Sequence, residues 1–263
     1  MIEYHNQNRI YLQSEPLLRT NLVAHGFTGR LGGVSTGKIT GLNLGFRVQD
    51  NPESVKANYR LVAEDLQLNF HNMVLAKQTH SDHIRIVTKD DAGKGLTRQS
   101  DIEDTDGLIT NLPEIPLVVF SADCVPLLFL DPKQKVIAAV HAGWRGTLKM
   151  IAGKAIQKMH QFFNCDPSNI LAAIGPSIGP CCCEFDTTDA SLFPSQYLSQ
   201  QENNKVLVDL WAMNRDQLIE HGVPSQNIDT SRICTICHAN QYYSYRTHKE
   251  RTGRQGAVIM LRP

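Results

Sequence analysis

The sequence predicts a single mixed α/β domain over residues 1–263, with a mixed β-sheet flanked by helices. Three short apolar runs, at residues 117–120, 126–130 and 136–140, are bounded by turn residues. Such runs are typical of strands that are buried on both faces. Stretches with helical spacing of apolar residues alternate with these and other predicted strands, which indicates a mixed α/β arrangement. No repeat, low-complexity segment or linker divides the chain, so we expect one domain.

The composition argues against partners that are recognised by charge. The 263 residues include 26 Lys and Arg against 26 Asp and Glu, so no net field favours nucleic acid or an anionic membrane. The first residues lack the apolar core of a signal peptide, and no run approaches transmembrane length. We therefore expect a cytoplasmic protein that is not bound to a membrane. Its seven cysteines are then expected to be reduced, for catalysis, metal binding or core packing.

The N-terminal half is predicted to contain a long loop that faces a ligand. An edge strand at residues 9–12 is followed by residues 25–51, a stretch with seven glycines and polar side chains such as Asn43 and Arg47. Glycine allows backbone to approach a ligand closely. Asn51, Pro52 and Glu53 then begin a helix that extends to about residue 68. Further strands are predicted at residues 73–76, 84–87 and 106–110, with a polar loop over residues 89–104.

The C-terminal half alternates helices and strands. A helix is predicted over residues 148–163 and a strand over residues 170–174. Asp209 is expected to cap another helix, which ends at His221 and Gly222. Residues 242–245 and 257–261 are predicted to pair as a final hairpin.

Three residues near predicted strand ends form a candidate metal site: His80, Cys124 and His141. Two imidazoles and a thiolate suit Zn²⁺, and three protein ligands leave a fourth position for water. The spacing does not force the three together, and each could be a structural residue. In a metal-free alternative, Cys124 is a nucleophile with His141 as its base. Asp123 would raise the pKa of that thiol, whereas zinc would deprotonate it.

The sequence HAGWRGT, at residues 141–147, is a candidate anion site. Amides at a helix N-terminus attract anions, and the guanidinium of Arg145 suits phosphate. The alternative is a tight connection between a strand and a helix, with Trp144 packed in the core.

The tail contains the pattern CxxCH at Cys234, Cys237 and His238. This pattern is that of covalent haem attachment, but the lack of an export signal argues against it. The pair could instead join two of three consecutive thiols in a structural zinc site. These thiols are Cys181, Cys182 and Cys183. Because consecutive thiols depart from the usual Cys-x-x-Cys arrangement, buried or surface thiols are the favoured interpretation.

Long motifs along nearly the whole chain resemble those of the YfiH-like family, also called laccase-domain-containing or polyphenol oxidase proteins. They are GRLGGVSTG with GLNLGFRVQDNPESVKANYR, KQTHSD, DTDGLIT, SADCVPLLFLD, VIAAVHAGWRGT, AAIGPSIGPCCCEF and CTICHANQYYSYRTHKERTGRQ. The resemblance implies a single mixed α/β domain that binds zinc through His80, Cys124 and His141. Cys183, Cys237 and His238 are not part of the family's motif.

The resemblance also implies an activity on purine nucleosides. The expected reactions are phosphorolysis of adenosine, inosine, guanosine and methylthioadenosine, and deamination of adenosine. Deamination needs an activated water, which a zinc ion can supply. Phosphorolysis needs phosphate beside the ribose, for which Arg145 and Arg47 are candidates, while Asn43 could hydrogen-bond the ribose or base. The expected partners are therefore purine nucleosides and inorganic phosphate, and the protein is expected to be a monomer or a dimer.

Two other enzyme classes and one carrier class remain as alternatives. The name laccase suggests copper-dependent oxidation of phenols, but the ten histidines contain no His-x-His pair of the kind a multicopper cluster uses. Cu²⁺ could still enter a site of two histidines and one cysteine. The second enzyme alternative is a thiol hydrolase that uses Cys124 and His141. The carrier alternative is a redox or haem protein that uses Cys234 and Cys237. A visible spectrum separates coloured haem or copper from colourless zinc.

Overall fold

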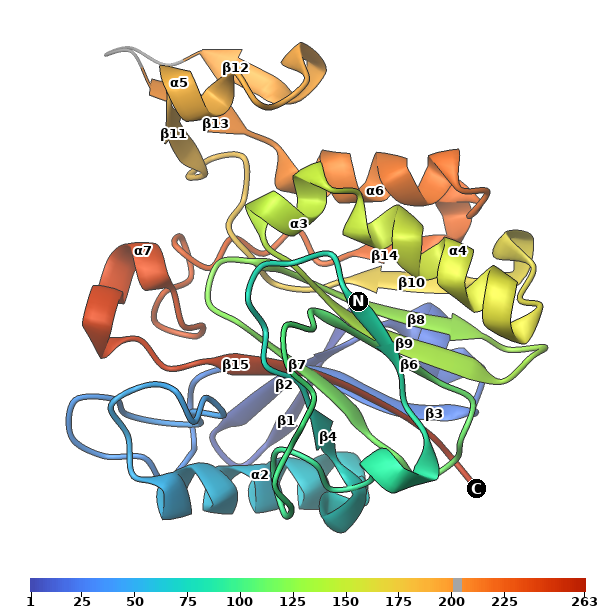
Figure 1. Ribbon diagram of the computed structural model, residues 1–263. Coiled ribbons are helices and arrows are strands. Elements are labelled where there is room, and N and C mark those ends of the chain that lie inside the picture. The colour runs from blue at the N-terminus through green and yellow to red at the C-terminus, as the bar shows by residue number, and fades with distance from the viewer. Residues whose placement is uncertain (201–204) are drawn as a thin grey trace.

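Two six-stranded sheets form the centre of the protein in the computed structural model, which describes residues 1–200 and 205–263 (Figure 1). The first sheet has the strand order β1 (Ile2–Asn6), β2 (Arg9–Gln13), β3 (Val23–Thr28), β15 (Gln255–Leu261), β7 (Leu117–Ser121) and β4 (Val74–Leu75). Its strands pair antiparallel except β4 and β7, which are parallel. The first sheet is therefore mixed.

The second sheet is also mixed. Its order is β14 (Ile228–Thr230), β10 (Leu171–Ile174), β8 (Val125–Asp131), β9 (Val136–Ala142), β6 (Gly107–Thr110) and β5 (Ile84–Ile86). The central pairs are antiparallel, whereas β10 with β14 and β5 with β6 are parallel.

Helices cover the outer face of each sheet, which gives four layers. Helix α2 (Pro52–Leu66) lies against the first sheet, and α3 (Trp144–Leu148), α4 (Ile151–Phe163) and α6 (Leu210–Glu220) lie against the second (Figure 1). Between the sheets, Leu117 and Val119 of β7 pack in one apolar cluster with Leu128 of β8. Burial of such apolar surface is the main force that holds the layers together.

A small third sheet stands apart from these layers. It has the order β11 (Glu184–Asp186), β13 (Lys205–Val208) and β12 (Leu198–Gln200), and it carries α5 (Thr187–Ala190). Figure 1 shows it at the end of the molecule beyond α3 and α6. Two further short helices, α1 (Glu15–Arg19) and α7 (Tyr245–His248), complete the α-helices of the described residues, which also contain short 3-10 helices.

The predicted fold class is confirmed. The three apolar runs are β7, β8 and β9, and β8 and β9 are buried along their whole length. Helix α2 begins as predicted, because the Asn51 side chain accepts a hydrogen bond from the Glu53 amide. Helix α6 also begins as predicted, with Asp209 accepting from the Ala212 amide.

Three local predictions were wrong. Strand β2 is not at the edge, because β1 pairs with its outer side. The helix predicted over 148–163 begins later, as α4 at Ile151, and ends at Phe163 as predicted; Met150, with a φ of 62°, separates it from α3. The predicted final hairpin does not form: residues 242–245 contain no strand, and β15 pairs with β3 and β7.

No helix within residues 1–200 and 205–263 combines the length and the apolar character needed to cross a membrane.

Candidate active site

The side chains of His80, Cys124 and His141 converge, although His141 lies 61 positions after His80 in the sequence. Their ligand atoms all lie within 4.8 Å of one another. The Nε2 atom of His80 is 3.6 Å from the Sγ atom of Cys124, and the two imidazole rings are 5.1 Å apart, centroid to centroid. Tetrahedral zinc with ordinary bond lengths would separate a nitrogen and a sulfur ligand by about 3.6 Å. The geometry thus fits a metal ion with three protein ligands.

Cys124 lies in the short connection between β7 and β8, where the chain passes from the first sheet to the second. Its neighbour Asp123 has a φ of 87°, a conformation that costs energy for a residue with a side chain. The Asp123 carboxylate accepts hydrogen bonds of 2.7 Å from the Thr235 hydroxyl and from the Arg246 amide. These bonds hold the strained turn in place and so fix where Cys124 points.

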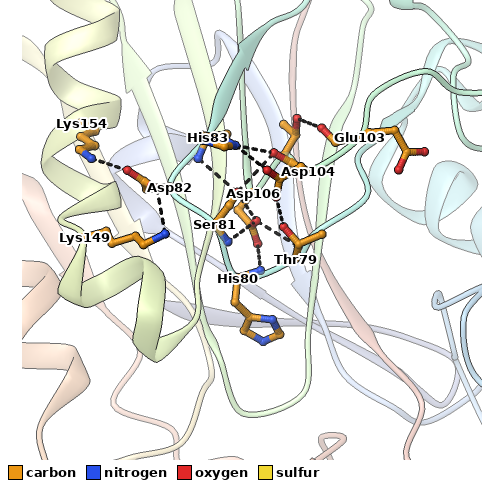
Figure 2. A network of polar contacts seen from close by, with 11 residues as sticks. Thr79, His80, Ser81, Asp82, His83, Glu103, Asp104, Asp106, Lys149 and Lys154 are labelled. Atoms are coloured by element: carbon orange, nitrogen blue, oxygen red, sulfur yellow. Dashed lines mark hydrogen bonds and ion pairs between the residues drawn. The ribbon is translucent and has the colours of Figure 1, made fainter. Parts of the chain in front are cut away.

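His80 lies in the loop between β4 and β5, not at a strand end as predicted, because β4 already ends at Leu75. It also has a left-handed φ, 64°. The buried Asp106 carboxylate holds this loop by accepting from the amides of Thr79, His80 and Ser81, at 2.8–3.1 Å, as Figure 2 shows. The His80 ring points away from this network (Figure 2). The loop is therefore fixed through its backbone while the ring stays free to bind.

Asp106 also orients His141. Its Oδ1 atom is 2.7 Å from the Nδ1 atom of His141, which leaves the Nε2 atom of that ring for the site. Burial raises the pKa of Asp106, but hydrogen bonds from His141, Ser81 and the Thr79 amide outweigh burial and lower it to about 2. One carboxylate thus positions two of the three converging residues.

Without a metal, the pKa values of Cys124 and His141 shift in opposite directions, which favours a thiolate–imidazolium pair. Burial raises the pKa of Cys124, but the charge and hydrogen bonds of His141 and His80 outweigh it and lower the pKa to about 6. The opposite happens at His141, where burial is outweighed by Cys124 and Asp106, and the pKa rises to about 9. The pKa of the thiol is thus lowered overall despite the neighbouring Asp123, whose carboxylate is bound by Thr235 and Arg246.

Gly143 follows β9 and permits the close packing of the site. A Cβ atom at this position would lie 2.4 Å from the Cδ2 atom of His80 and 3.5 Å from the Sγ atom of Cys124. Real Cβ atoms do not approach so closely, so only glycine fits without moving the His80 ring. This explains one glycine of the HAGWRGT sequence.

The three residues line a cavity of about 690 Å³, a volume within the range of small-molecule sites. Aromatic side chains on its wall include Phe120, Trp144 and Phe185. Trp144 and Phe185 contact each other edge to face, with centroids 5.7 Å apart. Charged side chains also line it: Lys77 is paired with Glu103, and Asp123 is bound by Thr235 and Arg246, while the other cations are Arg47, Arg246 and Arg254. The cavity therefore combines flat apolar surfaces with positive charge, next to the candidate metal site.

The other predicted binding residues are placed differently. Arg47, in the glycine-rich loop, lines the cavity. Asn43 is fully buried, and its amide bonds the backbone of Gly45 and Arg254 and the carboxylate of Asp50. Arg145 is exposed outside the cavity wall, with its guanidinium 4.0 Å above the Trp144 ring. Asn43 thus supports the wall, whereas Arg145 is not part of it.

Three residues of the site were missed from the sequence: Asp106, Arg246 and Arg254. The signal for Asp106 was present, since it directly precedes a buried strand in DTDGLIT. The two arginines lie in the tail, whose approach to the cavity depends on the hydrogen bonds of Asn43 and Asp123. No periodic pattern marks such contacts.

Comparison with known proteins identifies the family to which the chain belongs. The model of a family described as multi-copper polyphenol oxidoreductase laccase matches residues 24–262. The purine nucleoside phosphorylase YlmD of Bacillus subtilis is 34% identical over 247 residues, which is 91% of this chain and 89% of that protein.

Two crystal structures are also similar. That of YlmD from Geobacillus stearothermophilus is 32% identical, with a TM-score of 0.91 over 99% of this chain and 98% of that one. That of the Bacillus licheniformis hypothetical protein YfiH is 32% identical, with a TM-score of 0.90 over 98% and 97%. The chain therefore belongs to the laccase-domain family that includes the YlmD and YfiH proteins.

Proposed function

We propose that this protein is a zinc-dependent purine nucleoside enzyme. It cleaves adenosine, inosine, guanosine and methylthioadenosine with phosphate, and it deaminates adenosine to inosine. The observation that carries the proposal is the convergence of His80, Cys124 and His141 on the wall of a cavity with aromatic and cationic surfaces. The name of the Bacillus subtilis relative, purine nucleoside phosphorylase, supports the same class of reaction.

The donor set fits zinc. His80 and His141 supply nitrogen and Cys124 supplies sulfur, which matches sites that keep a position open for a reactant. Zinc bound there would supply Lewis acidity, which favours deprotonation of water and stabilises negative charge on oxygen. Asp106 fixes the tautomer of His141, as the carboxylates behind metal-binding histidines commonly do. The ligand side chains are thus oriented before a metal ion binds.

Phosphate is assigned to the arginines of the cavity wall. The Arg254 guanidinium is largely removed from water, and burial lowers its pKa although the charges of Cys124 and Asp123 oppose this. A desolvated guanidinium binds a phosphate in a bidentate manner. Arg246 and Arg47 line the same cavity. Phosphate held there would attack C1′ of the ribose as the bond from C1′ to the purine nitrogen breaks.

The purine base is assigned to the aromatic part of the wall. Phe120, Trp144 and Phe185 present flat faces or edges to the cavity, and aromatic side chains favour stacked or edge-on contact with another ring. This orients the base so that C1′ can face the arginines. Binding of both reactants in a fixed geometry is itself a large part of catalysis.

A copper-dependent polyphenol oxidase is the second candidate, because the matching family model carries that description. Copper can enter the same donor set. Within residues 1–200 and 205–263, however, the groups of possible metal ligands are this site and a cluster of four cysteines, and neither contains the several histidines of a multicopper centre. We therefore place phosphorolysis first.

The test is product analysis on the zinc-loaded protein. Adenosine is incubated with and without phosphate, and adenine, inosine, hypoxanthine and ribose 1-phosphate are separated by chromatography. Release of adenine that depends on phosphate, and that is lost in Cys124→Ala but kept in Cys165→Ala, supports the proposal. Cys165 is a matched control because it is buried in the core away from the cavity. Base release without phosphate, or turnover of phenols alone with copper, would refute it.

A further inference from the structure

Four cysteines outside the candidate active site gather into a second cluster. The sulfur atoms of Cys181, Cys182, Cys234 and Cys237 all lie within 4.8 Å of one another. Cys237 Sγ is 3.7 Å from that of Cys181 and 3.6 Å from that of Cys182. All four are free thiols. We call them the four-cysteine cluster.

The fold brings these cysteines together from two segments that follow neighbouring strands. Strands β10 and β14 are parallel, and the segments after them continue side by side. Ser177 forms a parallel bridge with Cys234, in which the Thr235 amide donates to the Ser177 carbonyl at 3.0 Å. The turn at residues 179–182 then places two thiols opposite the Cys-x-x-Cys pair.

The sulfur separations match a tetrahedral ion better than a disulfide. Zinc bound by thiolates at about 2.3 Å separates neighbouring sulfurs by about 3.8 Å, close to the 3.6 and 3.7 Å from Cys237 Sγ to the sulfurs of Cys182 and Cys181. A disulfide requires about 2.05 Å. The Cys-x-x-Cys spacing of Cys234 and Cys237 is one that structural zinc sites use.

The surroundings also favour a thiolate at the most buried member. The Gly179 amide donates to the Cys234 sulfur at 3.3 Å. Outer hydrogen bonds of this kind orient metal ligands and tune their charge.

We propose that the four-cysteine cluster binds a structural zinc ion, separate from the candidate active site. Four protein ligands fill a tetrahedral shell and leave no position for a reactant. The ion would fasten the segments after β10 and β14. These segments hold the turn before Cys124: Thr235 donates to the Asp123 carboxylate, and the Ile178 amide donates to its carbonyl at 2.8 Å. The zinc would thereby stiffen one wall of the cavity.

The first experiment measures zinc per chain by elemental analysis, on protein purified with a reductant. The wild type is expected to hold about two ions, and His80→Ala about one. Adding Cys181→Ser and Cys237→Ser to His80→Ala is expected to remove the remaining ion, whereas adding Cys165→Ala instead is expected to keep it. Cys181 and Cys237 are exposed, so the metal-free variant should still fold, which circular dichroism checks.

The second experiment requires no change to the cluster. Cobalt replaces zinc in His80→Ala, and four thiolate ligands should give strong charge-transfer absorption and the visible bands of tetrahedral cobalt. Weak absorption typical of oxygen or nitrogen ligands would overturn the proposal. So would a disulfide among these cysteines in the reduced preparation, iron in place of zinc, or a zinc content that His80→Ala alone brings to zero.

Discussion

Asp106→Asn tests how the candidate active site is positioned. The carboxylate accepts through Oδ1 from the His80 amide and from His141, and through Oδ2 from Thr79 and Ser81. A carboxylate only accepts, whereas an amide carries two donor hydrogens on one side. In either orientation, Asn therefore turns its NH₂ group toward backbone N–H groups that need an acceptor.

The magnitude follows from those lost contacts. A buried donor without an acceptor costs about 1–3 kcal/mol, so we expect a loss of that order in the free energy of unfolding. Removing the carboxylate behind a metal-binding histidine costs about 10–100-fold in metal affinity, which is about 1.4–2.8 kcal/mol. Both effects arise because Asp106 supports the His80 loop and sets the tautomer of His141.

The assay is zinc affinity by competition with a coloured chelator, alongside denaturant unfolding of the metal-free protein. Asp91→Asn is the matched control: Asp91 is also fully buried and accepts from the Thr88 amide, Arg85 and Lys94. It lies outside the cavity wall. We expect it to lower stability without changing zinc affinity. Equal zinc affinity in Asp106→Asn, wild type and Asp91→Asn would refute the reasoning.

Three further changes have defined outcomes. Gly143→Ala should displace the His80 ring. Because a shift of about 1 Å can cost about 100-fold in rate, kcat/KM for phosphorolysis should fall by about that factor. An unchanged kcat/KM would show that the added Cβ atom does not move the ring. Arg254→Ala should raise KM for phosphate by about 10–100-fold and leave the rate of deamination unchanged. Arg145→Ala should change KM for phosphate little. If initial rates show the larger rise in KM for Arg145→Ala, phosphate is bound by Arg145, as the sequence indicated. Burial lowers the pKa of His25 to about 4 from an ordinary value of 6.5. As the pH falls, His25 is therefore protonated in the unfolded chain before it is protonated in the folded protein. Stability should therefore decrease between about pH 6.5 and 4, by at most about 3 kcal/mol. Denaturant unfolding across this pH range should show a smaller decrease in stability for His25→Gln than for the wild type. An equal decrease would show that His25 is not its cause.

The fold class and the three candidate residues were accessible from the sequence because each has a local signal, but their convergence was implied only by the family resemblance. Apolar runs reveal buried strands, and soft metal donors are rare enough to stand out near them. How the strands are assigned to sheets was not accessible. The run that became β7 looks like those of β8 and β9, yet it pairs in a different sheet.

The binding residues show the same limit. Arg145 lies in a sequence that predicts an anion site, but its position beside the cavity is decided by stacking on Trp144. Arg254 has no such signal, and it reaches the cavity because the Asn43 side chain holds its backbone. Long-range contacts of a single side chain set these positions, and no periodicity in the chain encodes them.

The passage of the chain between the two sheets at Cys124 has a consequence for assembly. His80 follows a strand of the first sheet, His141 belongs to the second, and Cys124 lies at the crossing. Neither sheet alone can present all three ligands. An ion bound by the three ligands would therefore cross-link the two sheets, and it could bind only after the sheets have packed together. Ligands that bind only the native state stabilise it by mass action. Zinc uptake at this site should thus report completion of folding, and removal of that ion should make the layers easier to separate.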